Sequence, residues 1–102
     1  MTTELSSRRK TALVTGASGG IGKGVAEAAA RDGWHVVLTA RKTVDIDAFA
    51  DDWRRRYGVQ VTAIAQDLSL PGGADALFDA VQARGISIDC LVNNAGIGVF
   101  GE

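Results

Sequence analysis

Residues 15–22 read T-G-A-S-G-G-I-G, between an apolar run at 11–15 (T-A-L-V-T) and an alanine-rich run at 21–31. The apolar run is typical of a buried strand and the alanine-rich run of a helix. Three glycines fall in the turn between them: Gly16, Gly20 and Gly22. Glycine tolerates positive φ and lets a ligand approach the backbone without meeting a Cβ. Because a helix start presents unpaired N–H groups and a positive dipole end, the turn predicts a bound anion such as a nucleotide diphosphate.

Outward from this turn, strand-like and helix-like runs alternate. Further strands are predicted over 34–40, 59–65 and 88–92, and further helices over about 45–57 and 71–84. Glycines at the helix ends are typical stop signals. Alternation of this kind, with nearly continuous apolar strands, predicts a doubly wound α/β fold with a parallel sheet between two helical layers. Right-handed crossovers predict the strand order 3-2-1-4, with two helices on one face and one on the other.

In each predicted helix, apolar residues recur three or four positions apart, and this spacing predicts the face that packs on the sheet. In chain order these faces hold Ile21, Val25 and Ala28 or Ala29, then Ile46, Phe49, Trp53 and Tyr57, then Leu77, Phe78 and Val81. Asp45 is the expected N-cap of the second helix, and Pro71 is expected in the first turn of the third.

Length and composition limit the function classes. The 102 residues are one domain's worth or less, and we interpret 1–102 as the N-terminal part of a single Rossmann-type domain. A net charge of −1 favours neither nucleic acid nor an anionic membrane as a partner. Cys90 is the sole cysteine and lies in an apolar run, so we expect a small core residue and no disulfide. With no signal-like or membrane-length apolar stretch, a cytoplasmic location is expected.

The spacing of the glycines in this turn fits neither of two common nucleotide-binding motifs. The pattern is G-x-x-x-G-x-G, which differs from the common Rossmann G-x-G-x-x-G. A Walker loop needs glycine where Ala17 stands and Ser or Thr where Gly24 stands, so both required positions fail. We therefore interpret Lys23 as an ordinary surface residue in the first turn of its helix.

Three motifs together resemble the short-chain dehydrogenase/reductase family. They are T-G-x-x-x-G-x-G at 15–22, Asp67-Leu68 after the third strand, and Asn93-Asn94-Ala95-Gly96 after the fourth. Each stands at the carboxyl end of a predicted strand, and the resemblance runs from about residue 10 to residue 100. It implies a Rossmann-like oxidoreductase that moves a hydride between a nicotinamide cofactor and a small carbonyl or alcohol substrate.

The resemblance also implies a set of cofactor contacts. The pyrophosphate would lie against Gly16, Gly20, Ile21 and Gly22, with the Ser18 hydroxyl as a donor. Asp67 would accept a hydrogen bond from the adenine amino group, and Leu68 would lie beside the ring. The stretch from Asn93 to Gly96, including Ala95, would wall the nicotinamide ribose side, and Asn93 would brace the first strand near Thr15.

The end of the second strand indicates which dinucleotide is preferred. An acidic residue about 20 positions past the glycine turn holds the ribose 2′-hydroxyl of NAD, whereas an arginine suits the 2′-phosphate of NADP. This region reads Thr39-Ala40-Arg41-Lys42 and contains no carboxylate. Arg41 can pair with phosphate through its guanidinium, so NADP(H) is predicted over NAD(H).

The family's Tyr-x-x-x-Lys pair and serine are not found among these 102 residues. The one tyrosine, Tyr57, is followed four positions later by Val61 and lies on a predicted core face. We therefore expect the cofactor-binding N-terminal half of a reductase, inactive by itself and weak in NADP(H) binding. A non-catalytic dinucleotide-binding or sensing module and an inert folded fragment are the alternatives. The exposed edge of the fourth strand would favour a homo-oligomer.

Overall fold

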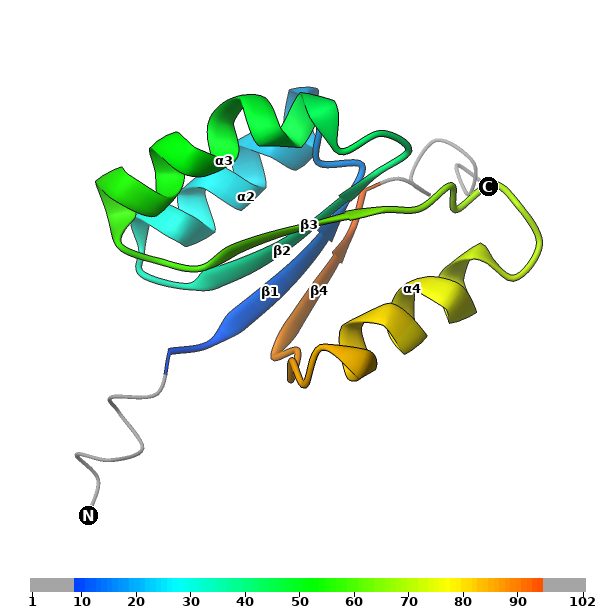
Figure 1. The fold of residues 1–102 in the computed structure, drawn as a ribbon. Helices are drawn as coiled ribbons and strands as arrows, with labels where there is room; N and C mark the ends of the chain where they lie inside the picture. Colours follow the sequence, from blue (N-terminus) through cyan, green and yellow to red (C-terminus); the bar gives the residue numbers. More distant parts are fainter. Residues whose placement is uncertain (1–8, 95–102) are drawn as a thin grey trace, which may run out of the picture.

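The computed structural model describes residues 9–94, which form four strands and three helices (Figure 1). The elements in chain order are β1 (Thr11–Thr15), α2 (Gly20–Arg31), β2 (His35–Ala40), α3 (Val44–Tyr57), β3 (Val61–Ala65), α4 (Gly73–Ala83) and β4 (Cys90–Asn93). Each coincides with a predicted run, with ends shifted by a residue or two.

The four strands form one parallel sheet in the order β3-β2-β1-β4, which confirms the predicted topology. Val14 at the centre of β1 is in register with Leu38 of β2 on one side and Val92 of β4 on the other. Because all strands run the same way, the segments that follow them meet along one edge of the sheet. That edge carries the glycine turn, Asp67-Leu68 and Asn93-Asn94.

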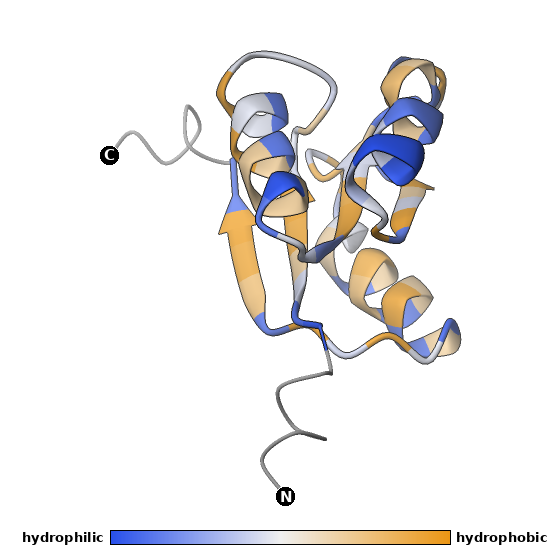
Figure 2. Cartoon of the chain, turned by 90° about the vertical axis from the view of Figure 1, so that its left-hand side faces the viewer, coloured by the Kyte–Doolittle hydropathy of each residue, from blue (hydrophilic) through white to orange (hydrophobic). Residues whose placement is uncertain are grey.

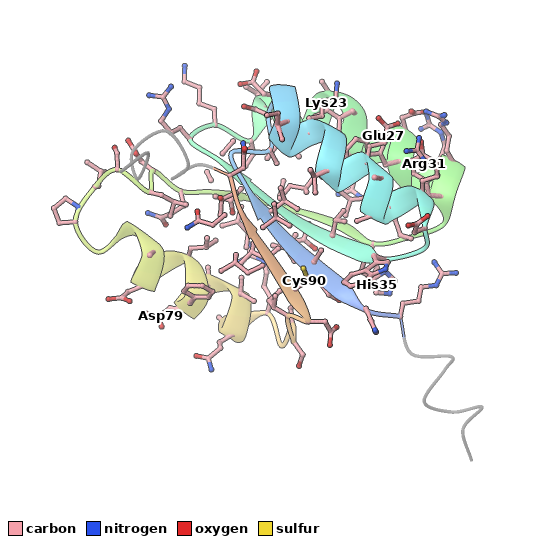
Figure 3. All side chains as sticks on the ribbon, turned by 180° about the vertical axis from the view of Figure 1, so that it is seen from behind. Lys23, Glu27, Arg31, His35, Asp79 and Cys90 are labelled. Carbon is pink, nitrogen blue, oxygen red and sulfur yellow. The ribbon has the colours of Figure 1, made fainter. Side chains whose placement is uncertain are left out.

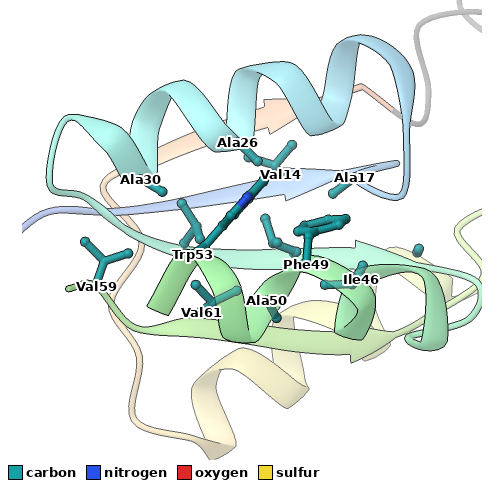
Figure 4. Close-up of a cluster of buried hydrophobic side chains, with 13 residues drawn as sticks. Val14, Ala17, Ala26, Ala30, Ile46, Phe49, Ala50, Trp53, Val59 and Val61 are labelled. Carbon is teal, nitrogen blue, oxygen red and sulfur yellow. The ribbon is translucent and has the colours of Figure 1, made fainter. Parts of the chain in front are cut away.

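Two helices cover one face of the sheet and one covers the other, as predicted (Figure 1). Side chains alternate along β1, so Val14 belongs to the cluster under α2 and α3 while Leu13 belongs to the cluster under α4. Figure 4 shows the first cluster, in which the Trp53 side chain is 2% exposed. The Phe49 and Trp53 rings are in contact, with their centroids 4.3 Å apart and their planes tilted by 38°. Ala26 and Ala30 face this cluster from α2, and their small side chains let the helix approach the sheet closely.

Two predicted helix faces were wrong in part. Ile21 is 74% exposed and Val25 is 37% exposed, because α2 turns its smallest residues toward the sheet instead. Phe78 is 44% exposed, although Leu77 and Val81 of α4 are buried as expected. Leu77 and Val81 lie four positions apart on one line of the helix, and the adjacent Phe78 projects about 100° away from that line.

The helix starts also differ from expectation. Thr43 rather than Asp45 precedes α3, and Asp45 lies in its first turn, where a carboxylate still favours the positive dipole end. Gly72 rather than Pro71 precedes α4, with a φ of +77°. Lys23 is half-buried, with its ammonium nitrogen 4.7 Å from the centroid of the Phe49 ring, so it helps to join α2 and α3.

The prediction that Cys90 is a core residue was wrong, since its side chain is exposed (Figure 3). Cys90 begins β4, which is an edge strand that pairs with β1 alone among the described strands. Figure 2 shows the apolar colouring of this edge strand, and Leu91 is 48% exposed. Self-association through this edge stays a prediction. Within residues 9–94, no helix is both long enough and apolar enough to cross a membrane.

Candidate cofactor-binding site

A cleft of about 660 Å³ lies where the carboxyl ends of the strands meet the first turns of α4. Its wall is formed by the glycine turn after β1, the ends of β2 and β3, and residues of α4 and β4. Six of the predicted site residues line it: Gly16, Ser18, Arg41, Asp67, Leu68 and Asn93. Four segments far apart in the sequence therefore converge on one cleft, as expected for the crevice of a doubly wound sheet.

The glycine turn has the backbone that the sequence predicted. Gly16 and Gly20 have φ angles of +60° and +59°, a region that favours glycine. A Cβ built on Gly20 would meet nothing within 4 Å, so the space beside this residue is open to a ligand. Gly19 is extended and precedes α2, and no described side chain caps the helix start. The first N–H groups of α2 are thus left to hydrogen-bond an anion.

Gly22 is required for packing inside the protein. A Cβ at this position would fall onto the carbonyl oxygen of Gly16 and 2.7 Å from Asn94 Nδ2. The Asn94 side chain donates to that same Gly16 carbonyl at 3.2 Å. The start of α2, the glycine turn and the segment after β4 are therefore in direct contact at Gly22.

Hydrogen bonds hold the cleft edge together across the strands. The backbone N–H of Ala17 in the glycine turn donates to the carbonyl of Thr39 at 3.1 Å. The Thr15 hydroxyl donates to Asn93 Oδ1 at 3.1 Å, which is the expected brace between β1 and the Asn93 side chain. These bonds fix the ends of three neighbouring strands relative to one another, so the cleft is largely preformed.

Asp67 is held as an anion at one end of the cleft. Its Oδ1 accepts hydrogen bonds from the Ser69 hydroxyl at 2.6 Å and from the Ser69 backbone N–H at 3.0 Å. These two bonds lower the pKa of the Asp67 carboxyl, and the positive charge of Arg41 adds a smaller effect in the same direction. Asp67 therefore stays ionised near neutral pH and can only accept hydrogen bonds.

Arg41 supplies positive charge to the same cleft. It is exposed, immediately follows β2, and is followed by the exposed Lys42. An exposed guanidinium on a cleft wall can bind a phosphate through paired donors without a large desolvation cost.

Not every predicted site residue lines the cleft. Gly20, Ile21 and Gly22 begin α2 beside it, and Ala95 and Gly96 lie outside the described residues. Sequence reasoning did not single out three residues that line the cleft: Thr39, Gln66 and Ser69. Their positions at or just after strand ends were the available signal. In the part of the chain that the structure describes, no cluster of His, Cys, Asp or Glu could hold a metal ion.

Comparison with known proteins agrees with this geometry. A family model described as short chain dehydrogenase matches residues 10–102. A very-long-chain 3-oxoacyl-CoA reductase of Anas platyrhynchos is 38% identical over 88 residues, which are 84% of this chain and 27% of that protein. The 3-oxoacyl-[acyl-carrier-protein] reductase FabG of Aquifex aeolicus (strain VF5) is 33% identical over 94 residues, or 92% of this chain and 38% of that protein. The chain thus spans about a third of the length of these relatives.

A solved structure of a reductase also resembles this chain. The L-sorbose reductase of Gluconobacter frateurii, complexed with NADPH and L-sorbose, matches with a TM-score of 0.78 and 38% identity. The match covers 84% of this chain and 33% of that one.

Proposed function

Because the chain belongs to the short-chain dehydrogenase/reductase family, we propose that it binds NADP(H) in the cleft at the carboxyl edge of the sheet. In this proposal it forms the cofactor-binding part of an oxidoreductase that acts on a small carbonyl or alcohol. One observation carries the proposal: the glycine turn, Arg41 and Asp67 all line a single cleft.

The residues present fit the charge and shape of this dinucleotide. The open space at Gly20 and the uncapped start of α2 suit the diphosphate. Asp67, which accepts hydrogen bonds, suits the adenine amino group, and the Arg41 guanidinium suits the 2′-phosphate. Thr39 also lines the cleft, and its buried hydroxyl has no partner within the described residues.

The bound dinucleotide supplies the hydride chemistry. The described residues would bind and orient it, with anion contacts at the turn, a base contact at Asp67 and a phosphate contact at Arg41. The order of these contacts along the edge follows the strand order, so the adenosine end lies toward β2 and β3. The nicotinamide end then lies toward β4 and Asn93, where a carbonyl substrate would be presented.

The choice between NADP(H) and NAD(H) is tested at Arg41. Arg41→Ala removes the cation proposed to bind the 2′-phosphate, so NADP(H) binding should weaken by about ten- to a hundredfold, or about 1.5–3 kcal/mol. NAD(H) binding should stay nearly unchanged, because that cofactor lacks the phosphate. Isothermal titration calorimetry at fixed salt measures both affinities.

Arg55→Ala is the matched control, since Arg55 is an exposed arginine of α3 outside the cleft. It removes the same charge without touching the proposed site, so both affinities should be those of the parent chain. Equal losses for the two cofactors in Arg41→Ala, or tighter binding of NAD(H) by the parent chain, would overturn the NADP(H) assignment.

A further inference from the structure

Among the described residues, Thr39 alone has a buried side-chain oxygen or nitrogen that lacks a hydrogen-bond partner. Its side chain is 1% exposed, and its Oγ1 has no partner among them. A buried polar group without a partner costs free energy, and native structures retain few of them. Thr39 also lines the cleft, so a ligand in the cleft is in position to supply the missing partner.

The neighbours of Thr39 indicate which part of a ligand it would meet. In the sheet it is in register with Thr15 of β1 and with Ile64 of β3. The glycine turn follows Thr15 on one side, and Asp67 follows β3 on the other. Thr39 therefore lies between the proposed diphosphate contact and the proposed adenine contact, two residues before Arg41.

Thr15 offers an internal comparison. It occupies the matching position on β1 and its side chain is also buried, but its hydroxyl donates to Asn93. One of two adjacent cleft threonines is thus used to brace the protein. The other presents a hydroxyl that can both donate and accept, and adenosine carries ring nitrogens and ribose oxygens that can pair with it.

We propose that the Thr39 hydroxyl is a hydrogen-bond contact to the adenosine part of the bound nucleotide. This inference rests on the proposed NADP(H) function and assigns a contact beyond the predicted set. It has an unusual consequence: the same hydroxyl should destabilise the protein without ligand and strengthen binding.

Thr39→Val tests both effects, because valine keeps the branched shape and replaces the hydroxyl with a methyl group. The probe is adenosine 2′,5′-bisphosphate, titrated calorimetrically into the 102-residue chain. We expect its Kd to rise about tenfold, the effect of losing one hydrogen bond in a buried site. Without ligand, the melting temperature should rise by a few degrees, since about 4–8 °C corresponds to each kcal/mol in a domain of this size.

Two variants serve as controls. Thr39→Ser keeps the hydroxyl and should bind the probe within about twofold of the parent chain. Thr62→Val removes a hydroxyl from a half-buried threonine of β3 that does not line the cleft, so the probe's Kd should be unchanged.

The outcomes separate this inference from the function on which it rests. Unchanged affinity in Thr39→Val, a lower melting temperature in that variant, or an equal loss in Thr39→Ser would each overturn the role of the hydroxyl while leaving the proposed function intact. Absence of probe binding by the parent chain would instead contradict the proposed function, and the Thr39 contact with it.

Discussion

Gly22 and Gly24 lie two positions apart in α2 and have opposite surroundings. A Cβ on Gly22 would collide with the Gly16 carbonyl and crowd the Asn94 side chain, whereas a Cβ on Gly24 would meet nothing within 4 Å. Neither has a positive φ, so the difference between them is one of space alone. Comparing the two glycines therefore distinguishes a lack of space for a side chain from the loss of helix stability that any glycine causes.

Alanine substitutions at these two glycines should therefore change stability in opposite directions. Gly22→Ala should lower the free energy of unfolding by about 1–3 kcal/mol, because the helix start must move away from the turn. Gly24→Ala should raise it by about 0.5–1 kcal/mol, because alanine loses less backbone entropy in a helix. Urea denaturation monitored by circular dichroism measures both. Equal stability of the two variants would show that the α2 start adapts without strain.

The glycine spacing predicted the turn correctly but could not give the reason for each glycine. The positive φ at Gly16 and Gly20 is a local backbone requirement, and local requirements can be read from spacing. The constraint at Gly22 comes in part from Asn94, more than seventy residues further along the chain, and only the folded arrangement reveals such a contact. Glycine is favoured both where a ligand approaches the backbone and where a helix packs closely, so the sequence alone could not distinguish these two reasons.

At the scale of elements, strand and helix positions were predictable, but the packing faces of α2 and, in part, of α4 were not. Each predicted run became the expected element because apolar periodicity and glycine stops are local signals. The packing face of α2 is set instead by how closely the helix approaches the sheet. That close approach selects Ala26 and Ala30 over the larger Ile21 and Val25, which the hydrophobic pattern alone favoured.

The junction of β2 and β3 should be sensitive to pH through His35. The His35 ring nitrogen Nδ1 accepts a hydrogen bond from the backbone N–H of Gln60 at 3.0 Å, which requires a neutral imidazole. Burial lowers the pKa of His35 from its usual value near 6.5, and the positive charge of Arg9 lowers it further. Because the pKa of His35 is lower in the folded chain, the unfolded chain binds the proton more readily. The contribution of neutral His35 to the free energy of unfolding is therefore complete above pH 6.5 and is lost as the pH falls through the folded-state pKa.

His35→Gln replaces the imidazole with an amide that does not titrate. Unfolding free energies of the parent chain should therefore fall between about pH 6.5 and 5, and those of the variant should fall less over the same interval. This interval lies above the range in which most carboxylates titrate, so the difference between the two slopes reports on His35. Parallel slopes in denaturant titrations across these pH values would contradict the prediction.

At the scale of the whole molecule, the two faces of the sheet are held by cores of different size. Among the described residues, the cluster under α2 and α3 contains thirteen buried residues, including Trp53, while the cluster under α4 contains five. Figure 4 shows the first of these clusters. Parallel topology placed the glycine turn and the ends of β2, β3 and β4 at one edge, which is why the cleft could be located from the sequence. The unequal faces depend on side-chain packing, and that packing became visible only in the structure.

This asymmetry predicts how the chain opens. Because α4 is held by fewer buried apolar residues, its detachment should cost less free energy than global unfolding. Native-state hydrogen exchange should show α4 amides, such as those of Leu77 and Val81, exchanging before those of Trp53 in α3. Amides of the central strands β1 and β2 should exchange last, since both lie between neighbouring strands.

Rates corrected for intrinsic exchange provide the comparison, and equal protection of α3 and α4 would show that the smaller core is as firmly held as the larger one. Since α4 also forms one wall of the cleft through Leu77 and Phe78, the helix predicted to open first is the one whose closure shapes the proposed nucleotide site.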